Sequence, residues 1–165
     1  MSSKTKIVVS WLVFILVADQ LTKLIVDRTM PLHHSIPVID NLFSLTYIRN
    51  TGAAFGIFAG SAAAFRLPFL IVFSLVAIGF VVAMLRRLPE GETGLITALA
   101  FILGGAIGNL IDRIAYGEVI DFLDFYWWGY HWPAFNDADS FITMGVGITV
   151  FYLIKVKGHD PFARS

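Results

Sequence analysis

The chain has 165 residues, of which 57% are hydrophobic and 15% are charged, and its formal net charge at pH 7 is zero. Soluble domains carry roughly a quarter charged residues, so this composition, with a mean hydropathy of +0.75, indicates a membrane protein. The absence of cysteine excludes disulfides and cysteine metal sites, and the zero net charge provides no basic field for binding nucleic acid.

Residues 7–26 are expected to form the first membrane span. Lys4 and Lys6 precede an apolar run that continues, with polar interruptions, to residue 26. A cleaved signal peptide begins in the same way, but no small-residue cleavage motif follows, so we interpret the run as a retained span of about 20 residues. Asp19 and Lys23 share one face of this helix, which favours a self-neutralising structural pair; contact with a substrate is the alternative.

Residues 27–64 are expected to lie outside the membrane. Two prolines interrupt this segment, and residues 43–47 follow the two-residue alternation of a strand. An Asn-Thr-Gly sequence at residues 50–52 supplies turn chemistry. The segment therefore predicts a small sheet on the membrane surface.

Residues 65–85 and 95–114 are expected to form the second and third spans. Arg86 and Arg87 close the second span, and a short polar turn leads to the third. Glycines at a GxxxG spacing in the third span predict close approach of another helix. These glycines are Gly104, Gly105 and Gly108.

A polar cluster ends the third span. It consists of Asn109, Asp112 and Arg113, of which the first and last are four residues apart and share a helix face. We interpret it as a self-contained structural cluster, with a role at a functional site as the alternative.

Residues 115–139 are expected outside the membrane, and residues 140–156 form the last span. The outer segment holds three of the four tryptophans and four aspartates: Asp121, Asp124, Asp137 and Asp139. Carboxylates clustered at a membrane edge are expensive to maintain and indicate function. Aromatic residues suit the headgroup level, either as anchors or as a gate for substrate. They are Phe125, Tyr126, Trp127, Trp128, Tyr130 and Trp132.

The basic residues predict a topology in which both termini are cytoplasmic. Seven of them, at positions 4, 6, 86, 87, 155, 157 and 164, then fall on the inner side. Five, at positions 23, 28, 49, 66 and 113, fall on the outer side or at outer span ends. This arrangement brings residues 27–64 and 115–139 to the same extracytoplasmic face with every polar cluster, which indicates a single site.

Among the candidate catalytic groups, the side chains favour acid–base catalysis by a pair of aspartates. Ser140 has only His131 as a candidate base, and that histidine lies in an aromatic-rich loop rather than in a polar cluster. The carboxylates lack a metal-loop spacing, and the adjacent His33 and His34 point apart in an extended segment. Two close carboxylates share a proton, so the ionised one can activate water while the protonated one donates to a peptide carbonyl, without metal or cofactor. From the residues alone, any two of the four aspartates are candidates.

Five short motifs lie along the four expected spans. In chain order they are Asp19-Gln20-x-x-Lys23; Arg49-Asn50-Thr51-Gly52-Ala53-Ala54-Phe55-Gly56; Gly104-Gly105-Ala106-Ile107-Gly108-Asn109-x-x-Asp112-Arg113; Val119-Ile120-Asp121-Phe122; and Pro133-Ala134-Phe135-Asn136-x-Ala138-Asp139-Ser140. Together they resemble the motifs of the lipoprotein signal peptidases (signal peptidase II), which are membrane aspartyl peptidases of bacteria. The resemblance implies a membrane all-α fold, a four-transmembrane-helix bundle with a small extracytoplasmic β-cradle and a periplasmic lid helix. Residues 27–58 and 115–135 would supply the cradle and the lid.

The same resemblance implies which residues act. Asp121 and Asp139 correspond to the catalytic pair, which leaves Asp124 and Asp137 as bystanders. Asp137 stands where the motif commonly has an apolar residue, and we interpret it as a cap of the last helix. Further residues are implied to surround the site or contact substrate. These are Asp19, Lys23, Asn50, Gly52, Asn109, Arg113 and Asn136.

The sequence therefore predicts a single-domain, monomeric intramembrane aspartyl endopeptidase of the bacterial cytoplasmic membrane. It would need no cofactor and would cut prolipoproteins before their diacylglyceryl-modified cysteine, with the substrate's signal helix against the bundle and its acyl chains in membrane lipid. The alternative is a small proton-coupled carrier with acidic relay residues, although four spans are few and the sequence has no internal repeat. A structural assembly factor is a third hypothesis.

Overall fold

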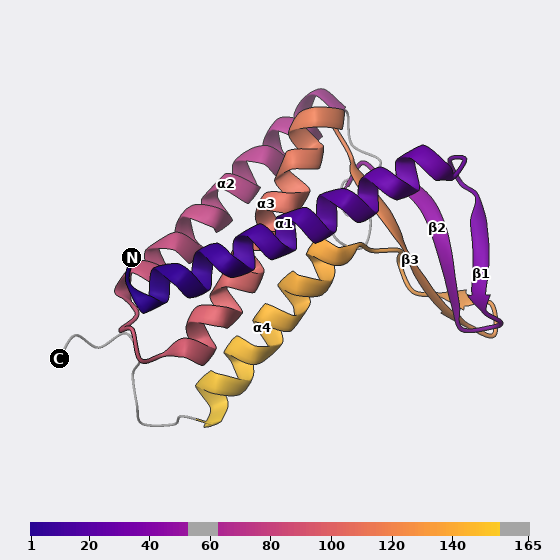
Figure 1. Ribbon diagram of the computed structural model, residues 1–165. Coiled ribbons are helices and arrows are strands. Elements are labelled where there is room, and N and C mark those ends of the chain that lie inside the picture. The colour runs from indigo at the N-terminus through magenta and orange to yellow at the C-terminus, as the bar shows by residue number, and fades with distance from the viewer. Residues whose placement is uncertain (53–62, 156–165) are drawn as a thin grey trace.

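The computed structural model describes residues 1–52 and 63–155 (Figure 1). Four helices are long and apolar enough to cross a membrane, and each overlaps one of the expected spans. They are α1 (Ser3–Thr29), α2 (Ala63–Arg87), α3 (Thr93–Tyr116) and α4 (Asp137–Lys155). Helix α1 continues to Thr29, beyond the span boundary expected at residue 26.

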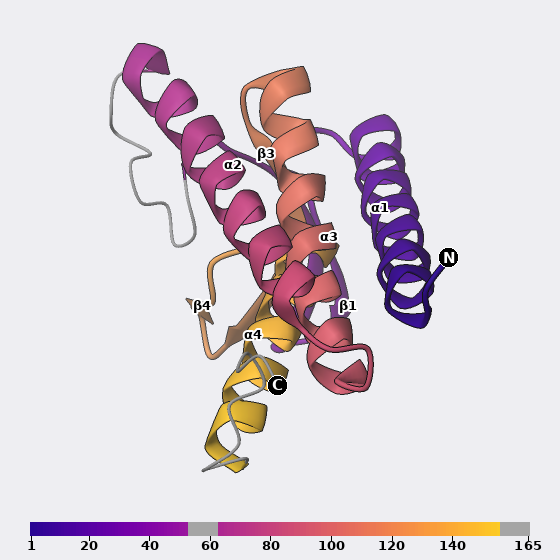
Figure 2. The same cartoon turned by 90° about the vertical axis from the view of Figure 1, so that its left-hand side faces the viewer.

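Helix α3 is the centre of the bundle. Figure 2 shows it between α1 and α2, with α4 beneath, and most of its residues are buried. The other three helices keep apolar side chains exposed, as lipid-facing helices do. Away from the sheet, the end of α2 packs on α3 through Val81, Leu85, Leu95 and Leu99.

Glycines bring α3 close to two neighbours, as the GxxxG spacing predicts. A Cβ at Gly104 would lie 3.0 Å from the Ile15 side chain of α1. A Cβ at Gly105 would lie 2.3 Å from the Ala138 carbonyl oxygen of α4. The approach is reciprocal, because a Cβ at Gly145 of α4 would lie 2.5 Å from the Ala98 carbonyl oxygen of α3.

A small antiparallel sheet stands at one end of the bundle. Its order is β1 (Ser35–Ile39), β2 (Phe43–Asn50), β3 (Val119–Trp127) and β4 (Tyr130–His131). The strand expected at residues 43–47 is therefore confirmed. The sequence did not predict β3 as a strand, because its largely apolar run lacks a clear alternation.

The register between β2 and β3 contains a bulge. Leu45 pairs with Leu123 and Ile48 pairs with Asp121, so three steps along β2 match two steps along β3. A bulge of this kind inserts an extra residue into one strand. Beyond it the pairing resumes and ends with Asn50 opposite Val119.

The end of α1 holds the sheet against the bundle. Val26 and Met30 share a hydrophobic cluster with Tyr47, Ile120 and Phe122 of the sheet. Beside this cluster, Arg49 Nη2 forms an ion pair of 2.6 Å with Asp27 Oδ1, which also accepts a hydrogen bond from the Tyr47 hydroxyl. The additional turn of α1 thus provides both apolar and charged contacts to β2.

The implied lid helix does not appear in the described residues. Between Met30 and Gly52, and again between Gly117 and Asn136, the chain consists of strands, turns and extended segments. Residues 53–62 lie outside the described part of the chain, and they include residues 53–58 of the segment expected to supply the cradle and the lid.

Candidate active site

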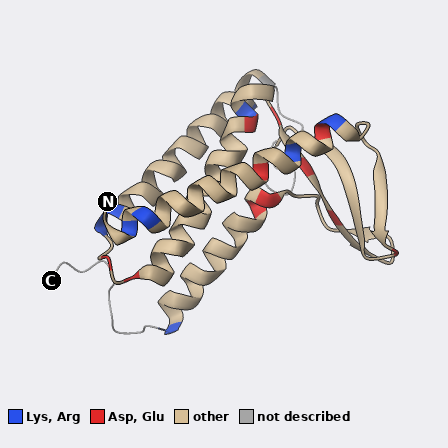
Figure 3. Ribbon diagram, viewed as in Figure 1, with Lys and Arg blue, Asp and Glu red and all other residues tan. Residues whose placement is uncertain are grey.

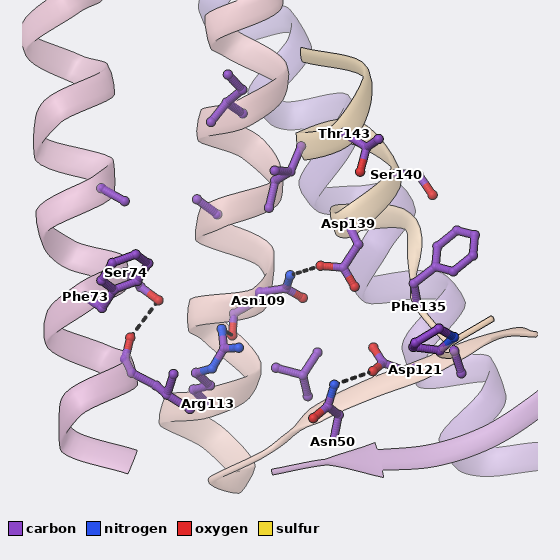
Figure 4. A pocket seen from close by; sticks show the side chains of 18 of the residues that line it. Asn50, Phe73, Ser74, Asn109, Arg113, Asp121, Phe135, Asp139, Ser140 and Thr143 are labelled. Atoms are coloured by element: carbon purple, nitrogen blue, oxygen red, sulfur yellow. Dashed lines mark hydrogen bonds between the residues drawn. The ribbon is translucent and has the colours of Figure 1, made fainter. Parts of the chain in front are cut away.

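Asp121 and Asp139 reach the same cavity from different elements. Asp121 projects from β3 and is only 2% exposed, whereas Asp139 lies in the first turn of α4. Their carboxyl groups point toward one another in Figure 4 and line a cavity of about 730 Å³. Apolar residues of α2, α3 and α4, such as Phe73, Ala106 and Ile142, form much of the remaining lining.

Asn136 connects the two aspartates. Its side-chain nitrogen donates to Asp121 Oδ1 at 2.7 Å, and its side-chain oxygen accepts from the Asp139 backbone N–H at 3.0 Å. Its own backbone N–H donates to Asp139 Oδ2 at 3.4 Å. This reciprocal pattern is a capping box at the start of α4.

The capping box corrects the expectation that Asp137 caps the last helix. Asn136 is the cap, and Asp137 is the first helical residue. The Asp137 carboxylate instead accepts a hydrogen bond of 2.7 Å from the Thr22 hydroxyl of α1. It therefore joins two helices on the side away from the cavity lining.

Two further amides hold the carboxylates. Asn50 Nδ2 donates to Asp121 Oδ2 at 2.9 Å, and Asn109 Nδ2 donates to Asp139 Oδ1 at 2.8 Å (Figure 4). The Gly52 backbone N–H donates to Asn50 Oδ1 at 2.9 Å and so orients that amide. Each aspartate thus receives a neutral donor, which fixes its rotamer without supplying a full counter-charge.

Lys23 is the centre of a buried ionic network behind the cavity. Its Nζ lies 2.9 Å from Asp19 Oδ2 and 2.9 Å from Asp112 Oδ2, and it donates to Asn109 Oδ1 at 3.1 Å. The expected Asp19–Lys23 pair is therefore present. The cluster at the end of α3 is not self-contained, because Asp112 pairs with a lysine of α1.

The network extends to both elements that carry the aspartates. Asp19 Oδ1 accepts from the Ala138 backbone N–H at 3.0 Å, at the start of α4. Asp112 Oδ2 accepts from the Ile120 backbone N–H at 3.3 Å, one residue before Asp121. The sequence prediction omitted Asp112 from the site; its place in the third motif, three residues after Asn109, was the available signal.

Arg113 also lines the cavity. Its guanidinium donates to the Gly52 and Asn109 carbonyl oxygens, each at 3.4 Å. Both acceptors are backbone carbonyls, so the guanidinium contributes positive charge beside the two carboxylates.

The pKa of Asp121 is raised to about 7, first by its burial and then by the negative charge of Asp139. Hydrogen bonds from Asn50 and Asn136 favour the ionised form and oppose this shift. At neutral pH, Asp121 therefore exchanges a proton readily, as a member of a general acid–base pair must.

Other candidate chemistries find no support in the geometry. Ser140 Oγ donates to the Asn136 carbonyl, whereas His131 Nδ1 lies 3.0 Å from the Asp124 carboxylate, so serine and histidine have different partners. The described residues contain no group of three or more His, Cys, Asp or Glu side chains suited to a metal ion.

Comparison with known proteins gives one consistent result. Residues 11–155 match the family model of signal peptidase (SPase) II. The chain is 54% identical over 140 residues to the lipoprotein signal peptidase of Geobacter sulfurreducens, covering 85% of this chain and 86% of the relative. It is 48% identical over 134 residues to that of Syntrophotalea carbinolica, covering 81% and 82% of the two chains.

Two solved structures of bacterial membrane enzymes share this fold. One superposes with a TM-score of 0.83 at 32% identity, covering 96% of this chain and 93% of the other. The second has a TM-score of 0.79 at 34% identity, covering 90% and 93%. None of these relatives supports the carrier hypothesis. The four apolar helices and the family match together show that the chain belongs to the signal peptidase II family and is a multi-pass aspartic protease of the bacterial inner membrane.

Proposed function

We propose that Asp121 and Asp139 form the catalytic dyad of an endopeptidase that removes signal peptides from prolipoproteins. The observation that carries this proposal is the meeting of both carboxylates in one cavity, held by Asn136 and with the pKa of Asp121 raised to about 7. A single chain supplies both groups, which supports action as a monomer. Like the relatives named above, it processes lipoprotein precursors.

The reaction begins with Asp121 protonated and Asp139 ionised. Asp139 takes a proton from a water molecule, whose oxygen attacks the scissile carbonyl carbon, while Asp121 donates its proton to the carbonyl oxygen. In the resulting tetrahedral intermediate the C–N bond breaks as Asp139 passes its proton to the leaving nitrogen. Asp121 recovers its proton from the hydroxyl of the intermediate, so the dyad returns to its starting state.

The remaining site residues position these groups. Asn50, Asn109 and Asn136 hold the carboxylates, and Gly52 orients Asn50. Arg113 offers positive charge to an oxygen of the substrate or the intermediate. Asp19 and Lys23 act from behind the cavity through the network that fixes the start of α4.

The cavity lining supports a lipid-modified substrate. Its walls on α2 and α4 are apolar, through residues such as Leu70, Phe73 and Met144, whereas the dyad lies among polar side chains. An apolar signal helix and acyl chains suit the former, and a peptide bond suits the latter. We assign the cut to the bond before the lipid-modified cysteine.

Charge supports an extracytoplasmic active site with both termini inside. Lys4 and Lys6 lie near the start of α1, Arg86 and Arg87 in the last turn of α2, and Lys155 in the last turn of α4. Figure 3 shows basic residues gathered where α1 begins, at the end of the bundle opposite the sheet, and at the far end of α4. Basic residues favour the cytoplasmic side. The sheet and the dyad then lie near the outer face, where exported precursors arrive.

Cleavage of a lipidated precursor by the purified protein tests the proposal. Asp121→Asn and Asp139→Asn, measured separately, should each abolish cleavage, because each removes one half of the proton exchange. Asp137→Asn is the matched control, since it lies two residues from Asp139 and retains an acceptor for Thr22. Wild-type rates in both dyad variants would refute the assignment. Equal cleavage of the unlipidated precursor would refute the preference for the lipid-modified cysteine.

A further inference from the structure

The tip of the β3–β4 hairpin presents bare aromatic side chains. Trp127, Trp128 and Tyr130 are 70%, 89% and 80% exposed, and the sequence from Phe125 to Asn136 contains no Lys, Arg, Asp or Glu. We call these three residues the aromatic tip. Large exposed apolar groups mark surfaces that meet a partner or a membrane.

The turn between β3 and β4 has a tryptophan at a position that usually holds a small or polar residue. Trp128 has φ +52° and Gly129 has φ +79°, the pattern of a two-residue type I′ hairpin turn. Asn-Gly suits such a turn, whereas positive φ is strained for a bulky residue. The hairpin therefore holds a tryptophan in an unfavourable backbone conformation and gains no burial in the protein by doing so.

Several contacts hold the base of the hairpin in place. His131 Nδ1 lies 3.0 Å from both oxygens of the buried Asp124, and the His131 ring stacks on Tyr126 with centroids 4.8 Å apart. The Trp132 backbone N–H donates to the Phe125 carbonyl at 2.7 Å. These contacts fix the direction in which the aromatic tip points.

The sheet carries this tip away from the helices. In Figure 1, β2 and β3 leave the bundle beside the start of α4 and run crosswise to α2 and α3. The adjacent β1–β2 turn adds Leu42, which is half exposed and whose carbonyl accepts from the Tyr126 backbone N–H at 2.9 Å. Asp40 and Asn41 are the polar neighbours there. The tip thus lies to the side of a bundle whose exposed helix faces are themselves apolar.

We propose that the aromatic tip inserts into the headgroup and glycerol region of the surrounding phospholipid, as a lateral anchor for the sheet. Tryptophan and tyrosine are enriched at this depth, because their rings are apolar and their N–H or O–H groups reach polar partners. The absence of charge on the tip and its position to the side of a bundle with apolar exposed faces select lipid as the occupant.

The anchor separates two roles among the aromatic residues of this segment. Trp132 and Phe135 line the cavity, whereas the aromatic tip does not. His131 and Trp132 are adjacent, so a tip fixed in lipid also fixes the strand that leads into the cavity wall. Anchoring and contact with substrate therefore belong to different residues.

Fluorescence depth measurement tests the anchor without any cleavage assay. Trp128 is made the sole tryptophan by Trp11→Phe, Trp127→Phe and Trp132→Phe, and the full chain is placed in phosphatidylcholine vesicles. Acyl chains brominated near the carbonyl end should quench its emission at least twofold more than chains brominated near the methyl end. Unchanged emission with both lipids, together with full quenching by aqueous acrylamide, would overturn the proposal.

A second comparison guards against misfolding of the triple variant. Trp128→Asn in the otherwise wild-type chain should keep or raise the Tm in detergent, because asparagine suits positive φ. In vesicles, the same substitution should accelerate amide hydrogen exchange in β3 and β4 several-fold, whereas Trp128→Tyr should not. Equal exchange in wild type and Trp128→Asn would refute the anchor and leave the proposed proteolysis unaffected.

Discussion

Asn136 donates a 2.7 Å hydrogen bond to Asp121 while its side-chain oxygen caps the helix that carries Asp139. One amide thereby sets the relative position of the two carboxylates. Substituting Asn136 with Ala should lower kcat by about 100-fold, the usual effect of losing a positioned polar group in an active site. KM should change little, since the amide contacts the carboxylates. Ser140→Ala, which removes only a hydroxyl bonded to the Asn136 carbonyl, is the control and should cleave at near the wild-type rate.

Lys23 balances two buried carboxylates, and its removal should be destabilising. Lys23→Met leaves Asp19 and Asp112 without their cation, a change that costs about 3–5 kcal/mol for buried pairs. Thermal unfolding in detergent should show a lowered Tm. Adding Asp19→Asn and Asp112→Asn to Lys23→Met should recover part of the loss, because no buried charge then remains unpaired. A triple variant less stable than Lys23→Met would contradict a charge-based role.

Gly105 is expected to tolerate no side chain. Its added Cβ would meet the Ala138 carbonyl oxygen at 2.3 Å, so Gly105→Ala must push α4 away from α3. We expect a lower Tm and a reduced kcat, because Asp139 begins the displaced helix. Gly79→Ala on α2 is the matched control: nothing lies within 4 Å of its added Cβ, and alanine gains up to about 1 kcal/mol in helix propensity. Equal effects of the two substitutions would exclude helix separation as the cause.

Cleavage should decline as the pH rises above about 7, where Asp121 loses the proton that it donates. The pH profile of kcat/KM with a lipidated precursor measures this limb. A rate that stays constant from about pH 6 to pH 9 would contradict Asp121 as the acid, because its pKa of about 7 falls inside that range.

Thermal stability should also depend on the ionisation of Asp121, and it should fall as the pH rises. The folded-state pKa of Asp121 lies above the value of about 3.9 for an unfolded aspartate, so its contribution is fully present below about pH 4 and is lost as the pH rises through about 7. Tm should therefore fall over this window. In Asp121→Asn the fall should be smaller, and an unchanged slope would assign the pH dependence to other groups.

The residues alone did not decide which two of the four aspartates form the pair, and the strand β3 explains why. Asp121 and Asp124 are three residues apart in β3, so they face opposite sides of the sheet, and Asp124 turns to His131. If the sequence had predicted a strand at residues 119–127, the alternation of side chains between the two faces would have separated Asp121 from Asp124. Their apolar run lacks the necessary alternation, and only the motif resemblance selected Asp121 with Asp139.

The other features that the sequence did not predict depend on contacts between helices and strands. Composition and hydrophobic runs predicted all four helices, because burial in lipid imposes a length and a polarity that a sequence displays directly. The Lys23–Asp112 pair depends on how α1 lies against α3, and such packing is not encoded in local spacing. The Asn136 cap was accessible in principle, since its partner Asp139 follows at the three-residue spacing of a capping box.

The bulge in β2 makes the residue count of that strand part of the chemistry. Because three steps on β2 match two on β3 there, Asn50 faces the same side of the sheet as Asp121. Without the bulge, a regular register continued from Leu45 and Leu123 would place Arg49, rather than Asn50, opposite Val119 and on the side of Asp121. The guanidinium of Arg49 would then replace the neutral amide of Asn50 beside Asp121. A permanent cation in that place would keep both carboxylates ionised, so the extra residue of the bulge is a condition for the shared proton.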